Sequence, residues 1–177
     1  MRRLVAFLLF IIAAIGGHAL TLHLVPSVIM DTAQSRLADQ GLPLHQWAAS
    51  PRMTPQTQTI VRPSPDLSYS VCRFDVRDGP VLISAPGWDG YGSLSIFDDR
   101  TNNVFVANLD GENAEVLILP LSDKDALITP DLADKERVLI AEGLGLALIR
   151  RVAPDAQLHE AAVSLIDQST CKVIRQY

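Results

Sequence analysis

The run LSYSVCRFDV at residues 67–76, followed by DGP at 78–80 and by VLISA at 81–85, decides the fold of this chain. Apolar and polar side chains broadly alternate along the first run, which is the period-two pattern of a half-buried β-strand. An Asp-Gly-Pro sequence between two such runs is a tight-turn signal. These residues therefore predict two consecutive strands, and the sequence on both sides extends the pattern.

Downstream of this pair, short runs of β character recur, separated by turn residues at intervals of roughly 8–13 residues, which is typical of an antiparallel β domain. Further strands are predicted at residues 91–97, 104–109, 114–120, 137–143 and 144–152. Residues 122–135 interrupt this series, because they are polar with only scattered apolar side chains, and one helical turn is expected at 129–133.

The last part of the chain predicts a helix over residues 155–168. Its apolar residues recur at i, i+3, i+4, i+7 and i+8: Leu158, Ala161, Ala162, Leu165 and Ile166. Pro154 and Asp155 suit the start of this helix, since a missing N–H costs little there and a negative charge meets the positive helix end. The expected fold class is mainly β (α+β), an antiparallel β-sandwich-like domain over residues 66–177 with this C-terminal helix packed against it.

Upstream of the β region, residues 27–40 predict a short helix that Gly41 ends. Five of the eleven prolines then fall within residues 41–65. Proline fixes φ and biases the residue before it toward extended backbone, so this segment is expected to be extended and to wrap around the domain. Trp47 within it is expected to bury its ring against the domain.

The N-terminus predicts a single membrane-spanning helix. Residues 1–3 contain two arginines, and residues 4–25 are 22 residues without a formal charge. At about 1.5 Å rise per residue they form a helix of roughly 33 Å, which matches the hydrocarbon core of a bilayer. The competing interpretation is a signal peptide with its cleavage site after Ala19.

Both interpretations export the domain. Arg2 and Arg3 stay on the cytoplasmic side by the positive-inside tendency. We therefore expect a single-pass protein of the bacterial inner (cytoplasmic) membrane, in contact with the lipid bilayer through residues 4–25. Its C-terminal domain is expected on the periplasmic or extracellular side.

Composition excludes several classes of protein. The chain has 177 residues and a formal net charge of −5, so it is not expected to bind nucleic acid, whose phosphates require a basic surface. Its four histidines include no pair with the i, i+4 spacing of a helical zinc site, so no metal site is expected. No cofactor is expected either, because the sequence contains no phosphate-binding or dinucleotide-binding loop.

The two cysteines, Cys72 and Cys171, have two interpretations. In an oxidising compartment they can form a disulfide that closes a loop of about 100 residues. Otherwise, each is a separate buried thiol that packs as a small apolar side chain.

A polar cluster follows the run at residues 91–97, and two aromatic residues precede or begin that run. The candidate ligand or interaction residues are Tyr69, Trp88, Tyr91, Asp98, Asp99, Arg100 and Asn102. Aromatic rings with carboxylates and amides at one sheet end can bind a polar ligand such as a sugar. The other interpretation is that Asp and Asn simply build turns.

A structural ion pair is also considered. Arg150 and Arg151 follow an apolar run, and one of the two can point inward and pair with Asp75 or Asp98.

Three segments, at residues 64–75, 79–86 and 91–102, resemble the bacterial domain of unknown function 1254. The matching residues are Asp66, Tyr69, Ser70, Asp75, Gly79, Pro80, Pro86, Tyr91, Ser93, Leu94, Asp98, Thr101 and Asn102. The chain departs from the family pattern at Ser64, Gly90 and Gly92. The resemblance implies a β-rich fold in the cell envelope and supplies no established activity.

The resemblance also bears on partners. Many family members continue into a second β domain, of unknown function 1214, and this chain is expected to be a short, anchored form without it. We therefore expect a non-enzymatic binding or assembly module of an envelope complex. Its expected partner is a separate protein resembling that second domain, or else a second copy of the chain. The alternative is a hydrolase-type enzyme that uses Asp98 or Asp99 on a polar ligand.

Overall fold

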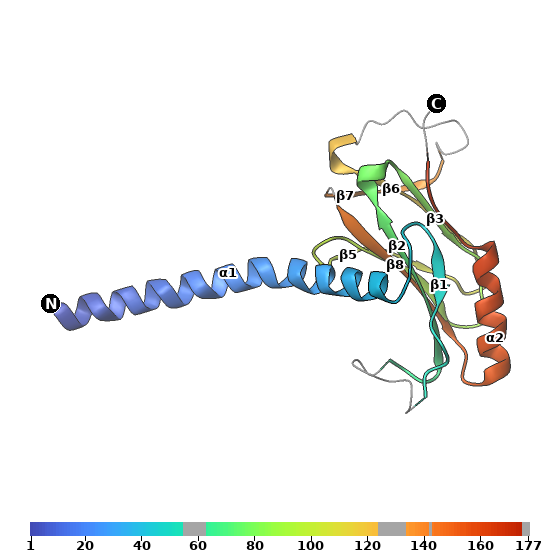
Figure 1. Ribbon diagram of the computed structural model, residues 1–177, viewed down its shortest axis with the longest axis horizontal. Helices are drawn as coiled ribbons and strands as arrows, with labels where there is room; N and C mark the ends of the chain where they lie inside the picture. Colours follow the sequence, from blue (N-terminus) through green and yellow to red (C-terminus); the bar gives the residue numbers. More distant parts are fainter. Residues whose placement is uncertain (55–62, 124–133, 142, 175–177) are drawn as a thin grey trace.

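The computed structural model describes residues 1–54, 63–123, 134–141 and 143–174. The helices are α1 (Arg2–Asp39) and α2 (Ala156–Ser164), with short 3-10 turns η1 (Val76–Asp78), η2 (Leu121–Asp123) and η4 (Leu165–Gln168). The strands are β1 (Trp47–Ala49), β2 (Leu67–Asp75), β3 (Val81–Ala85), β4 (Gly92–Phe97), β5 (Asn103–Asn108), β6 (Ala114–Pro120), β7 (Glu136–Ile140), β8 (Leu144–Val152) and β9 (Thr170–Val173). Figure 1 shows the strands gathered at one end of a long α1.

The strands form two sheets. Sheet A has the order β1-β2-β8-β4-β5, and sheet B has the order β7-β6-β3-β9. All strand pairs are antiparallel except β6 and β7, which are parallel. The predicted fold class is confirmed. The parallel β6–β7 pair was not predicted, since the turn residues in the sequence indicate hairpins and parallel strands are joined by a crossover. Much of that crossover, including the helical turn expected at 129–133, lies outside the described residues.

The core fills the space between the two sheets. Even-numbered residues of β2 face inward, and Cys72 and Phe74 are fully buried. A disulfide joins Cys72 on β2 to Cys171 on β9, with a Cα–Cα distance of 6.6 Å. The disulfide is therefore the correct one of the two interpretations, and it links sheet A to sheet B across the core.

Helix α1 is continuous over 38 residues, although two segments, 4–25 and 27–40, were predicted separately. Pro26 lies inside it and removes one backbone hydrogen bond. Beyond the proline the helix is held by tertiary contacts, since Met30 and Gln34 are buried and Gln34 is hydrogen-bonded to sheet A. After the helix ends at Asp39, the chain turns away at Gly41, whose φ is +84°.

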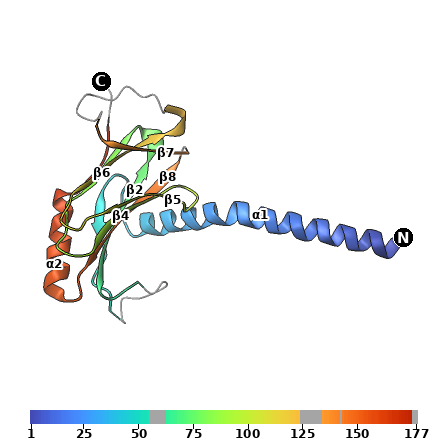
Figure 2. The same cartoon turned by 180° about the vertical axis from the view of Figure 1, so that it is seen from behind.

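The two helices lie on opposite sides of sheet A (Figures 1 and 2). Helix α1 projects away from one face of the sheet, which we call the outer face. Asp155 is the N-cap residue of helix α2, and its side chain accepts a hydrogen bond from the Leu158 N–H at 2.8 Å. Between α1 and β2, residues 41–54 contain β1 and no helix, and Trp47 packs against the core. The rest of the predicted extended segment includes residues 55–62, which lie outside the described residues.

Candidate functional site

The candidate ligand residues do not form one site. Trp88 and Tyr91 lie before β4, and Asp98 follows its other end. Six residues of extended chain span about 20 Å. The aromatic residues and the carboxylates therefore lie at opposite ends of one strand and cannot hold the same small ligand.

Asp98 builds the turn between β4 and β5. One carboxylate oxygen accepts hydrogen bonds from the N–H groups of Arg100 at 2.9 Å and Asn102 at 2.8 Å. The other oxygen accepts from the Asn102 side-chain amide at 2.8 Å. These bonds hold Thr101 at a φ of +62°. Asp98 is buried, and both of its oxygens are engaged within the turn.

The rest of this turn faces α1. The Arg100 guanidinium lies 3.2 Å from both the backbone oxygen and Nδ1 of His23. Burial raises the pKa of Asp99, and the neighbouring charge of Asp98 adds to the effect, with a smaller contribution from Asp31 on α1. The polar cluster that the sequence singled out is thus a helix-facing turn.

The aromatic candidates have structural partners as well. Trp88 is buried, and its indole N–H donates to the Val152 carbonyl at 3.0 Å. The Tyr69 hydroxyl accepts a hydrogen bond from the Ser64 N–H at 2.9 Å. Only Tyr91 of the three is exposed, at 52%.

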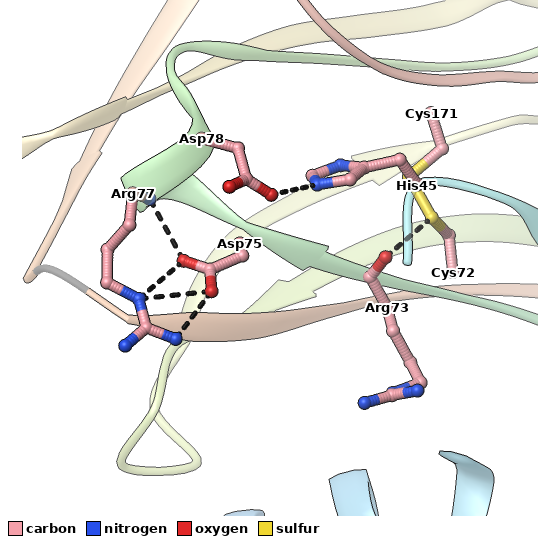
Figure 3. Close-up of polar contacts among 7 residues, drawn as sticks. All are labelled: His45, Cys72, Arg73, Asp75, Arg77, Asp78 and Cys171. Carbon is pink, nitrogen blue, oxygen red and sulfur yellow. Dashed lines mark hydrogen bonds and ion pairs between the residues drawn. A yellow bond between two sulfur atoms is a disulfide. The ribbon is translucent and has the colours of Figure 1, made fainter. Parts of the chain in front are cut away.

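Among the described residues, neither Asp75 nor Asp98 forms an ion pair with Arg150 or Arg151. Asp75 instead contacts the Arg77 guanidinium at 2.5 Å, and this hydrogen bond lowers the pKa of Asp75 (Figure 3). For Asp75 the register explains this, since Asp75 pairs with Leu144 at one end of β8, whereas Arg150 and Arg151 lie near its other end.

Both arginines find other acceptors. Arg150 donates to the Ser95 hydroxyl at 3.5 Å, and the fully buried Arg151 donates to the Pro86 carbonyl at 2.8 Å. Burial lowers the pKa of Arg151 to about 10.

The sequence analysis missed the contact that holds α1 to sheet A. The Gln34 amide donates to the Gly145 carbonyl of β8 at 2.8 Å and accepts from the Arg73 guanidinium of β2 at 2.7 Å. Arg73 also donates to the Leu42 carbonyl at 2.7 Å. We call these four residues the helix–sheet junction. Its sequence signal was Gln34 itself, which lies four residues after Met30 on the apolar side of the helix.

A second polar contact lies close to the junction. His45 Nε2 is 3.1 Å from a carboxylate oxygen of Asp78, and Figure 3 shows this pair beside Asp75, Arg77 and the disulfide. It ties the segment after α1 to the turn that follows β2.

Two cavities of the domain lie away from Asp98 and Asp99. One, of about 390 Å³, lies between the end of α1 and β1, and its lining includes Leu37 and Trp47. The other, of about 230 Å³, includes Pro86 and Glu115. Across the described part of the chain, no three His, Cys, Asp or Glu residues gather as metal ligands.

Helix α1 is long and apolar enough to cross a membrane. Its most apolar 18-residue stretch has a mean hydropathy of 2.3, and none of that stretch is buried. One such helix near an N-terminus is also compatible with a signal sequence.

The fold resembles two solved structures of bacterial proteins. A crystal structure of a protein from Vibrio parahaemolyticus matches with a TM-score of 0.63 and 15% identity, covering 84% of this chain and 35% of that one. A putative uncharacterised protein from Burkholderia cenocepacia matches with a TM-score of 0.41 and 13% identity, covering 66% of this chain and 32% of that one. This chain thus spans about a third of the length of each. The first likeness supports the fold alone.

A comparison with curated proteins finds no match. Residues 45–172 match the family described as "Protein of unknown function (DUF1254)", which covers most of the chain. The matched range runs from the segment before β1 to β9 and so includes both sheets and α2. The chain belongs to the DUF1254 family.

Proposed function

We propose that this chain is a membrane-anchored, non-enzymatic module that holds a binding surface at the periplasmic face of the bacterial inner membrane. One observation carries the proposal. A single helix runs from a fully exposed apolar stretch to the buried Gln34, which is hydrogen-bonded to both central strands β2 and β8. A flexible linker would leave the domain free to rotate relative to the membrane, whereas a continuous helix restricts which face of sheet A is directed toward it.

The orientation rests on two further features. Arg2 and Arg3 precede the apolar stretch and favour a cytoplasmic N-terminus. The Cys72–Cys171 disulfide suits a domain outside the cytoplasm, because intracellular reductants keep most thiols reduced.

A binding role is favoured over an enzymatic one by how the carboxylates are used. Both carboxylate oxygens of Asp98 accept hydrogen bonds within its own turn, and Arg100 contacts His23 of α1. The proposed partner is a protein resembling the second β domain found in longer family members, or a second copy of this chain.

Three measurements on the full chain in cells test the proposal. Carbonate extraction is expected to leave the protein in the membrane pellet. A C-terminal reporter that is active only outside the cytoplasm is expected to be active. Intact-mass spectrometry is expected to find residues 1–19 still attached. A cytoplasmic C-terminus, or a soluble product cut after Ala19, would overturn the anchored module.

One observation favours the alternative, a hydrolase acting on a polar ligand such as a sugar. The raised pKa of Asp99 is what a general acid requires. Purified full-length protein, assayed against envelope glycans, tests this directly. Turnover that is lost in Asp99→Asn without a fall in the melting temperature would favour the hydrolase over the binding module.

A further inference from the structure

Four strands lie at the edges of the two sheets, and β5 differs from the other three. Strand β1 has only three residues, β7 begins with Glu136 and Arg137, and the four-residue β9 contains Lys172. Short length, charge and β-bulges are among the usual ways in which proteins protect a sheet edge from pairing. Strand β5 has six residues, no charge, and a valine, Val106, that is 58% exposed, although a bulge at Val104 interrupts its pairing with β4.

The backbone of β5 has free hydrogen-bonding groups on its open side. The Leu109 N–H donates to the Gly92 carbonyl at 2.9 Å, and with the β4–β5 register this directs alternate residues toward β4. The N–H and C=O groups of Val106 and Asn108 therefore point away from the sheet, whereas Val104 is the extra residue of the bulge and has no Cα partner on β4. Outside the β4–β5 pair, no backbone hydrogen bond to Val106 or Asn108 is found in the described part of the chain.

From these observations we propose that β5 is a homodimer interface, which rests on and deepens the proposed function. Two copies pair their β5 strands antiparallel about a two-fold axis at Val106. Val106 then faces Val106 of the second copy at the centre of the strand pair. The hydrogen-bonded pair at Val106 exchanges two bonds, and the strand pairing extends sheet A from five strands to a continuous sheet of twice that number.

The membrane helix favours a second copy of this chain as the molecule that pairs with β5. Helix α1 projects from the outer face of sheet A (Figures 1 and 2). Antiparallel pairing turns one copy about an axis normal to the sheet, so both outer faces stay on the same side. Both helices then enter one bilayer in the same direction. Parallel pairing of the same edge would send the helices in opposite directions, which two copies in one membrane cannot satisfy.

Charge and confinement support the same arrangement. The chain has a net charge of −5, so two copies repel each other over most of their surface, yet the Asn103–Asn108 edge carries no charge. A single strand pair buries less than the roughly 1,200 Å² of a standard stable interface. Anchoring both copies in one bilayer raises their effective concentration and offsets this small area.

The geometry also separates the two membrane helices. Helix α1 is bonded to β8 and β2, and β8 lies two strands inside β5. Five strand spacings of about 4.8 Å therefore put the two β8 strands roughly 24 Å apart. In this dimer the sheets touch at β5 and the helices do not touch in the membrane.

A single engineered cysteine tests the pairing in membranes of cells that express the full chain. Both native cysteines are already joined in the disulfide, so Val106→Cys adds the one free thiol. Directly opposed residues of a hydrogen-bonded pair have Cα atoms about 5.5 Å apart, within disulfide range. Mild oxidation is expected to give at least tenfold more covalent dimer with V106C than with Glu160→Cys, an exposed control position on α2. Equal yields from the two variants would overturn the interface.

A second pair of variants keeps the test independent of cysteine chemistry. Val106→Lys places two like charges opposite each other, and Val106→Thr keeps a β-branched side chain. The dimer fraction of detergent-solubilised protein is expected to fall about tenfold with V106K and to persist with V106T. A dimer that survives V106K and crosslinks through Ala13→Cys would assign the contact to the helices and overturn the proposal. Membrane fractionation separates this proposal from the proposed function. If V106K stays in the carbonate-resistant membrane pellet, the anchored module holds whatever the dimer result. Loss of the wild-type protein from that pellet would count against the proposed function itself.

Discussion

Two adjacent aspartates of the β4–β5 turn have different environments. Asp98 accepts three hydrogen bonds from the turn, whereas Asp99 has a buried oxygen with no hydrogen-bond partner in the part of the chain that the structure describes. Residue type alone cannot separate these roles, because both are Asp in the same polar run. Asp99 instead lies beside Gly143 and is affected by the charge of Asp31 on α1, and both of these residues are distant in the sequence.

We expect Asp99→Asn to stabilise the protein at pH 7. The pKa of Asp99 is raised above its ordinary value of 3.8, so the folded state binds the proton more tightly than the unfolded chain does. The contribution of the Asp99 carboxyl to the free energy of unfolding is therefore most favourable below about pH 3.8, and it is lost as the pH rises through the folded pKa. The amide that replaces the carboxylate in D99N has no charge to desolvate, so the gain should shrink toward pH 3.

The measurement is the melting temperature of full-length protein in detergent between pH 3 and pH 8. Asp89→Asn, at an exposed position, serves as the matched control. A D99N protein that melts below the wild type at pH 7 would mean that the Asp99 carboxylate makes a favourable contact.

Gly145 illustrates a steric requirement at a single residue. It lies directly opposite Phe74 in the β2–β8 pair, and a Cβ added at Gly145 would overlap the Phe74 ring. We expect Gly145→Ala to lower the free energy of unfolding by about 1–3 kcal/mol, the usual range for overpacking a core. Chemical denaturation of the full chain measures this.

A double-variant cycle checks the cause. In a Phe74→Leu background the ring is absent, so adding Gly145→Ala should cost clearly less than it does in the wild type. Equal costs in the two backgrounds would place the strain elsewhere.

At the scale of elements, the strands between 67 and 152 could be predicted because each is a short alternating or continuously apolar run bounded by turn residues. Strands β1 and β9 were missed, since three or four residues hold too little pattern. Pairing was harder still. Whether Asp75 meets Arg77 or Arg150 depends on the β2–β8 register, which no local pattern encodes.

Helix α1 and sheet A are coupled through the helix–sheet junction, and Gln34→Leu is expected to loosen it. The substitution leaves the Arg73 guanidinium and the Gly145 carbonyl each without its bond to Gln34, which is itself buried at this contact. Losing a buried hydrogen bond to a charged group typically costs about 1.5–3 kcal/mol. Hydrogen exchange of full-length protein in detergent should show faster exchange in residues 30–42 and little change in β3 or β6.

Gln40→Leu is the matched control, because Gln40 is exposed at the end of the same helix. Similar exchange in Q34L and wild type would mean that apolar contacts around Met30, and not the junction, hold the helix to the sheet.

At the scale of the whole molecule, two sheets with different neighbours are held together across one core. Sheet A contacts α1 on its outer face, and sheet B has no contact with the junction residues among the described hydrogen bonds. The disulfide between β2 and β9 is the covalent link between them. Its existence could not be decided from the sequence, because 99 residues separate the two cysteines and pairing depends on sheets that the sequence does not place.

Replacing both cysteines, as Cys72→Ala with Cys171→Ala, is expected to destabilise the domain while keeping the fold. Closing a loop of about 100 residues lowers the entropy of the unfolded chain by an amount worth up to about 4.7 kcal/mol in the chain-entropy model, and two small cavities add to the loss. Unfolding in denaturant, followed on full-length protein in detergent, should show a lower midpoint for the double variant. The control is internal, since a reducing agent should lower the midpoint of the wild type toward that of the variant and leave the variant unchanged. Wild-type protein isolated from cells with two free thiols, or a reductant-insensitive midpoint, would contradict the link between the sheets and would remove one support for placing this domain outside the cytoplasm.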